Sequence, residues 1–149
     1  MRIMTLNYQT EYAMRIVIYL MLYPERVIPT REIADKYGLS VNHLNKVSQK
    51  LVRLDVISSS RGAGGGVKLN ESSADMKIGD LMRKIEPNNE VAACAGAKTL
   101  KPCVISPVCQ LRGLFAGAQQ AFWDYLNQYK VSDLVHKNKP ELKGIFDAL

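Results

Sequence analysis

The sequence predicts a mainly α-helical fold that carries one small β-hairpin. Three observations lead to this class. Apolar residues recur at spacings of three and four along several segments. Two short β-prone runs flank a glycine-rich stretch near residue 60. A long apolar stripe of helical spacing follows residue 106. Together these features indicate a helical domain with a hairpin and a long additional helix.

The composition fits a globular protein, because 47% of the 149 residues are hydrophobic. The longest apolar run, Ile16–Tyr23, is far shorter than the roughly 20 residues that cross a membrane. The first residues lack the apolar run and cleavage site of a signal peptide. We therefore expect a cytoplasmic protein that does not contact a membrane.

The first half of the chain predicts two consecutive helices. Thr10–Tyr23 is mostly apolar, as in a buried helix, and Pro24 ends it. Thr30 is expected to cap a second helix over Arg31–Tyr37, and Gly38 suits the position after its end.

After a short turn, Ser40 is expected to cap a third helix. Its predicted buried face consists of Val41, Leu44, Val47, Leu51 and Leu54. A helix, a glycine-containing turn and a helix with a polar outer face form the helix-turn-helix pattern. The β-prone runs at 56–60 and 67–69 then predict a hairpin, which is a wing when it follows such a helix.

Basic charge is concentrated in this region. Between Lys36 and Lys68 there are six basic residues and one acid, so the segment carries +5 of the total +6. Such a patch favours a double-stranded DNA partner. The predicted base-contacting residues are Ser40, Asn42, His43 and Lys46. Lys50 and Arg53 are expected to contact phosphates, and Arg61 on the wing to enter the minor groove.

The second half predicts a short helix over Asp75–Glu86 and an irregular loop over 88–105. A long helix is expected from Ser106, its N-cap, to about Tyr129. Its apolar stripe exceeds what one small domain can cover, so we predict a homodimer. The tail from His136 is polar and basic, and we expect it to be partly mobile.

Four parts of the chain follow from these elements. The expected DNA-binding domain spans 1–87 and the cysteine loop spans 88–109. The dimerisation helix and the tail span 110–135 and 136–149.

The three cysteines, Cys94, Cys103 and Cys109, lie within one short segment. Their spacing differs from the close pairs of a zinc ribbon, and no histidine lies near. Three thiolates suit an iron–sulfur cluster with one weakly held iron, preferably 4Fe-4S rather than 2Fe-2S. Cys109 is expected in the first turn of the long helix, whose positive end favours a thiolate. The alternative is three small core residues.

The sequence does not favour an enzyme, since it shows neither a nucleophile–base pair nor paired carboxylates in a glycine-rich setting. The glycine run at 62–66 also lacks the Lys-Ser/Thr ending and the strand-to-helix setting of a nucleotide-binding loop.

The chain resembles the winged-helix iron–sulfur transcription regulators, the family that includes NsrR, IscR and RirA. The resemblance rests on the wing VISSSRGAGGGV (56–67), the following IGDL (78–81), the three-cysteine loop before a long helix, and VSDLV (131–135). It extends from about Leu6 to Val135.

Within the family the chain is most similar to the NsrR-type repressors that sense nitric oxide. Arg112 stands where IscR-like members place a histidine ligand. The resemblance implies a cluster on the three cysteines, with Glu11 of the partner subunit as a candidate fourth ligand. An ordinary surface pair with Arg15 is the other interpretation of Glu11. Alternative functions are a response to iron or cluster status, and a thiol-redox or zinc-containing DNA-binding regulator without a cluster.

Overall fold

The computed structural model describes residues 7–86 and 103–149. In this part of the chain it is mostly helical, with one two-stranded antiparallel sheet, and the predicted fold class is confirmed. The elements, in order, are α1 Tyr8–Leu22, α2 Thr30–Tyr37, α3 Val41–Arg53, β1 Ile57–Ser60, β2 Gly66–Leu69, α4 Glu71–Ala74, α5 Ile78–Ile85, α6 Gln110–Leu126, α7 Asp133–His136 and α8 Lys139–Asp147.

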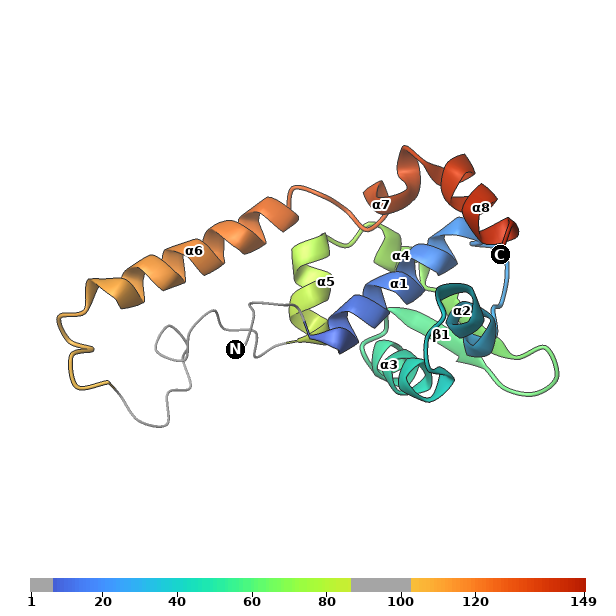
Figure 1. The fold of residues 1–149 in the computed structure, drawn as a ribbon, viewed down its shortest axis with the longest axis horizontal. Helices are drawn as coiled ribbons and strands as arrows, with labels where there is room; N and C mark the ends of the chain where they lie inside the picture. Colours follow the sequence, from blue (N-terminus) through green and yellow to red (C-terminus); the bar gives the residue numbers. More distant parts are fainter. Residues whose placement is uncertain (1–6, 87–102) are drawn as a thin grey trace.

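Helix α1 lies at the centre of the helical body (Figure 1). It contacts α3, α5, α7, α8 and β2. Ile16, Val17 and Leu20 are buried on it and join the main hydrophobic core. Because α1 contacts α3 and β2 as well as α7 and α8, a shift of α1 would displace both the DNA-binding half and the C-terminal half.

The predicted hairpin is present and is anchored to the helical body. Ile57 pairs with Leu69 and Ser60 with Gly66. Outside the hairpin, Val67 exchanges backbone hydrogen bonds with Ile28 at 2.8 and 2.9 Å. The wing is therefore fixed to the segment that precedes α2.

Helix α6 extends away from the body, and its C-terminal end packs against α5 (Figure 1). Trp123 is buried there against Ile78 and Met82. Towards the other end of α6 most apolar side chains are exposed, and Leu114 is 68% accessible. The predicted apolar stripe is therefore largely uncovered in a single chain.

Two helix starts in the first half differ from the prediction by a residue or two. Helix α1 begins at Tyr8, because the Asn7 side chain accepts a hydrogen bond from the Gln9 backbone N–H at 3.1 Å. Thr30 is the first residue of α2 rather than its cap, since Pro29 occupies the N-cap position. Gly38 ends α2 in the left-handed conformation, as expected.

The predicted helix over Asp75–Glu86 is wrong at its start. Asp75 closes the short α4, and α5 begins only at Ile78. Before α5, Lys77 is extended and forms an antiparallel bridge with Lys130 of a distant segment. Val131 donates its N–H to the Met76 carbonyl at 3.0 Å, and Ile78 donates to the Tyr129 carbonyl at 3.0 Å.

The long helix also begins and ends elsewhere. Ser106 and Val108 donate backbone hydrogen bonds to Cys103 and Ile105, so this stretch forms turns. Helix α6 begins at Gln110 with Cys109 as its N-cap, three residues later than the predicted N-cap Ser106. It ends at Leu126, before the predicted Tyr129.

The C-terminal segment, predicted to be a partly mobile tail, instead forms α8. Phe146 is buried and makes edge-on contacts with the rings of Tyr19 and Tyr37. Lys36 donates a hydrogen bond to the Phe146 carbonyl at 2.5 Å. Phe146 thus contacts both α1 and α2, and Leu142 also packs against the core. Of the described helices, none is long and apolar enough to cross a membrane.

Candidate nucleic-acid interface

One face of α3 is buried and the opposite face is polar and exposed. Leu44, Val47, Ser48 and Leu51 face the core. Because successive residues turn by about 100° in an α-helix, Asn42, Gln49 and Arg53 lie on the opposite side, and all three are exposed. The predicted residues His43 and Lys46 are also exposed. Ser40 is the N-cap of α3, but its side chain makes no capping hydrogen bond.

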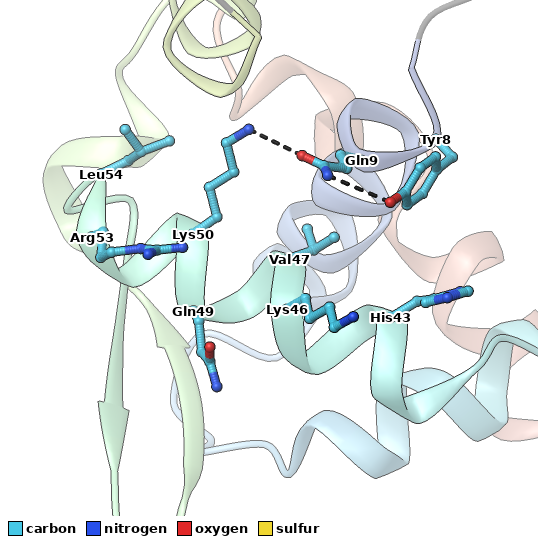
Figure 2. A pocket seen from close by; sticks show the side chains of 9 residues that line it. All are labelled: Tyr8, Gln9, His43, Lys46, Val47, Gln49, Lys50, Arg53 and Leu54. Atoms are coloured by element: carbon cyan, nitrogen blue, oxygen red, sulfur yellow. Dashed lines mark hydrogen bonds between the residues drawn. The ribbon is translucent and has the colours of Figure 1, made fainter.

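A hollow of about 530 Å³ separates α3 from the first turn of α1 (Figure 2). His43, Lys46, Lys50 and Arg53 supply its basic lining, and Tyr8 and Gln9 form its other wall. None of its described lining residues is acidic. A polyanion is the partner such a surface attracts.

Lys50 does not stand free in this hollow. Its ammonium group donates to the Gln9 side-chain oxygen at 3.1 Å, as Figure 2 shows. The Tyr8 ring lies beside the His43 ring, with centroids 6.0 Å apart. The start of α1 therefore contacts two of the residues predicted to bind DNA.

The predicted wing residue Arg61 directly follows β1 and is exposed. Gly62 and Gly64 adopt φ values of 96° and 78°, in a region that disfavours side chains. The turn of the wing therefore depends on glycine, and it leaves the arginine accessible.

The candidate cluster ligands are described only in part. Cys94 lies outside the described residues. Cys103 is exposed and Cys109 is half-buried, and both are free thiols in the segment that leads into α6. This segment lies at the outer end of α6, away from the start of α1 (Figure 1).

Glu11 lies in the first turn of α1, with its carboxylate 3.8 Å from the Arg15 guanidinium. The helix end that carries it lies away from the segment that leads into α6 (Figure 1). Within residues 7–86 and 103–149, no three His, Cys, Asp or Glu side chains gather to hold a metal.

The donor set nevertheless suits an iron–sulfur cluster. Cys109 is the N-cap residue of α6, so its thiol lies at the positive end of that helix. Cys103 is accessible on the same turn-rich segment. Two soft donors separated by only five residues are thus available to iron.

The sequence prediction missed several residues that line the hollows around α3. Gln49 could have been found from the helical period, since it lies seven residues after Asn42. Tyr8, Gln9 and Thr30 could not, because only the packing of α1 and α2 against α3 brings them there.

A helix-turn-helix followed by a β-hairpin wing, with a basic outer face on the second helix, defines a winged-helix DNA-binding regulator. The model of the Rrf2 family, described as iron-dependent transcriptional regulators, matches residues 6–137. The chain belongs to the Rrf2 family. It is a DNA-binding transcription regulator and not an enzyme.

Relatives and solved structures agree with this assignment. The chain is 34% identical to the HTH-type transcriptional regulator NsrR of Shouchella clausii, over 95% of each chain. It is 33% identical to the regulator of the same name from Halalkalibacterium halodurans, over 95% of this chain and 97% of the other. The fold is similar to T. potens IscR, with a TM-score of 0.69, 20% identity and coverage of 89% and 86%. It is also similar to Staphylococcus aureus CymR, with a TM-score of 0.67, 22% identity and coverage of 86% and 95%.

Proposed function

We propose that this regulator is a repressor that depends on an iron–sulfur cluster and that nitric oxide relieves its repression. The observation that carries the proposal is the pair of free thiols, Cys103 and Cys109, at the positive end of α6. The name of the two relatives, NsrR, and the iron-dependent description of the family support it.

Cys94, Cys103 and Cys109 would hold the cluster, preferably 4Fe-4S, since three thiolates leave one iron for another ligand. When bound, the cluster supplies an iron with which nitric oxide reacts. Glu11 of the partner subunit is the proposed fourth ligand. It lies at the start of α1, and Figure 1 shows that this helix end lies away from the described segment before α6, which favours donation between subunits.

Dimerisation through α6 is the second part of the proposal. Leu111, Leu114, Phe122 and Tyr125 are each more than 40% exposed on α6. A contiguous apolar surface of this kind marks an interaction site. A symmetric pair would place two α3 helices about one DNA turn, ~34 Å, apart on a near-palindromic operator.

The first turn of α1 provides a connection between the cysteine loop and DNA. Thr10 is hydrogen-bonded to Glu86, the last described residue before the loop. Gln9 is bonded to Lys50 of α3. Glu11 lies in the same turn. As a cluster ligand it would couple the state of the cluster to the positions of Gln9 and Thr10. A coupling of 1–3 kcal/mol would change DNA affinity about 5–150-fold.

A second candidate function is a thiol-responsive regulator without a cluster. The exposure of Cys103 favours it, because an accessible thiol can be oxidised. A structure of CymR in its oxidised form is among the solved structures of similar fold. In this alternative the cysteines themselves carry the signal.

The deciding experiment is purification without oxygen, followed by counting iron and sulfide per chain. We expect iron in the native protein and its loss in Cys103→Ala. The holo protein is then used to select DNA fragments from the genome, and their binding is measured before and after nitric oxide. Weaker binding after nitric oxide supports the proposal. Unchanged binding favours a response to iron or cluster status, and a protein without iron favours the thiol-responsive alternative.

A further inference from the structure

The start of α5 is capped by a distant part of the chain. Its N-cap residue, Lys77, makes no side-chain capping hydrogen bond. The first N–H groups of a helix have no partner within the helix, so another segment must supply one. The Asp80 backbone N–H donates to the Asn127 side-chain oxygen at 3.1 Å, across 47 positions of the sequence. The Ile78 N–H donates to the Tyr129 carbonyl at 3.0 Å. The end of α6 therefore caps α5.

Asn127, the C-cap of α6, makes a second contact with Asp80. Its amide nitrogen donates to the Asp80 carboxylate at 3.1 Å, so the two residues are joined in both directions. Gly79 permits this approach, because a Cβ atom there would lie 2.5 Å from the Asn127 side-chain oxygen and 3.1 Å from the Trp123 carbonyl oxygen. We call Gly79, Asp80 and Asn127 the α5–α6 clamp.

Contacts before and after Asn127 in the sequence hold the same junction. Before it, Trp123 is buried against Met82, and the Arg83 guanidinium lies 5.0 Å from the centre of the Trp123 ring. After it, the Lys130 ammonium group pairs with the Asp75 carboxylate at 2.8 Å. Because these contacts flank the clamp, α6 cannot tilt against α5 without breaking some of them. The junction therefore holds α6 in one orientation relative to the DNA-binding half.

The length of α6 amplifies any change at the clamp. Its 17 residues span about 25 Å at ~1.5 Å per residue. Leu111 and Leu114, which are exposed near its outer end, belong to the proposed dimer surface. A tilt of about 10° at the clamp would move that end by about 4 Å relative to the body. One base-pair step along DNA is only ~3.4 Å. The angle at the clamp thus determines the distance between the two α3 helices to about one base pair.

We propose that the α5–α6 clamp sets the spacing between the two DNA half-sites that the regulator accepts, with Asn127 as the positioning residue. Asn127 does not need to contact DNA for this role, because it acts through the orientation of α6. The inference rests on the proposed dimer through α6 and on DNA binding by the family, and it does not depend on which signal the regulator senses.

The test selects bound sequences from random duplexes of about four helical turns, ~40 base pairs, with protein purified without oxygen. Sequencing then gives the half-site and the distance between its two copies. Asn127→Ala removes both side-chain bonds of the clamp. Its matched control is Asn138→Ala at the exposed N-cap of α8, where the side chain makes no capping hydrogen bond. Asp80→Ala removes the carboxylate acceptor, and its control Asp80→Asn keeps an acceptor oxygen there. Thermal unfolding confirms that each variant is folded.

We expect one spacing for the wild type, Asn138→Ala and Asp80→Asn. Asn127→Ala should select the same half-site, since α3 is unchanged, with spacings that spread by about one base pair to either side. Asp80→Ala should spread them less, because one clamp bond remains. A residue that only stabilises the fold would lower the unfolding temperature and leave the spacing unchanged.

The outcomes separate this inference from the proposed dimer. If Asn127→Ala selects the same single spacing as the wild type, the clamp does not set the spacing and the dimer stands. If the wild type selects unpaired half-sites, the dimer and the inference fall together. If Asn127→Ala does not fold, the Asp80 pair decides, and equal spacing distributions in its two variants would overturn the inference.

Discussion

The Thr10 hydroxyl donates a 2.7 Å hydrogen bond to the Glu86 carboxylate. The two residues are 76 positions apart in the sequence. Thr10 is buried in the first turn of α1, and Glu86 is the C-cap of α5. The bond therefore fixes the start of the central helix to the point where the chain enters the cysteine loop.

Replacing Thr10 by valine keeps the side-chain volume and removes the donor. We expect Thr10→Val to lower the free energy of unfolding by about 1–2 kcal/mol, because a half-buried carboxylate loses its hydrogen bond. Urea denaturation measures this. A double-mutant cycle with Glu86→Gln isolates the pair, and fully additive single effects would show that the bond does not stabilise the fold.

Glu11 and Arg15 provide a matched test of the proposed fourth ligand. Both side chains are substantially exposed and their ion pair is 3.8 Å long, so it contributes little to stability. We expect Glu11→Gln to alter the visible absorption of the protein purified without oxygen, and Arg15→Gln to leave it unchanged. Identical spectra of the two variants would reject Glu11 as a ligand and leave it as a surface pair.

Gly66 and Gly144 should respond in opposite directions to alanine. At Gly66 the added Cβ would meet backbone atoms of Ile28 and Pro29 within 2.7 Å, so the wing must move. We expect Gly66→Ala to cost about 1–3 kcal/mol of stability. Gly144 lies inside α8 with open space around the added atom, and Gly144→Ala should stabilise by about 0.5–1 kcal/mol. Thermal unfolding compares the two, and equal effects would contradict the close contact of the wing.

Alkaline pH should loosen the aromatic cluster beneath α8. Burial raises the pKa of Tyr37 to about 12, and burial together with the Glu32 hydrogen bond raises the pKa of Tyr19. In the unfolded chain a tyrosine loses its proton near pH 10. Stability from Tyr37 is therefore complete below about pH 10 and is lost as the pH rises towards 12.

We expect Tyr37→Phe to weaken this decline when unfolding free energies are compared at pH 8 and pH 11. The exposed Tyr8, changed to phenylalanine, serves as the control. A decline of the same size in Tyr37→Phe and Tyr8→Phe would show that the ionisation of Tyr37 does not matter.

Local sequence signals predicted most of the first half of the fold. Gly38 ends α2 as expected, because its left-handed conformation is a local preference of glycine. Leu44, Val47 and Leu51 of the predicted face of α3 are buried, since one face must meet the core, whereas the predicted Val41 and Leu54 are half-buried and the buried Ser48 was missed. The excess of basic over acidic residues between Lys36 and Lys68 can be counted directly in the sequence, and it correctly indicated a DNA partner.

Two errors arose where the local signal was misleading or weak. Ser106 and Pro107 form a good helix start, yet turns occupy that stretch and Cys109 caps α6 instead. The polar tail looked mobile because a single buried residue, Phe146, is too weak a signal in a sequence.

The sequence by itself determined the class of this protein and the order of its longer helices, because these depend on side-chain type and on periods of a few residues. The tertiary structure decided where α5 begins, how α8 docks, and which side chains line the hollows beside α3. Those outcomes depend on contacts between residues far apart in the chain. A local sequence pattern does not specify which distant group will pair with a backbone N–H or C=O, or which segment will cover an apolar face.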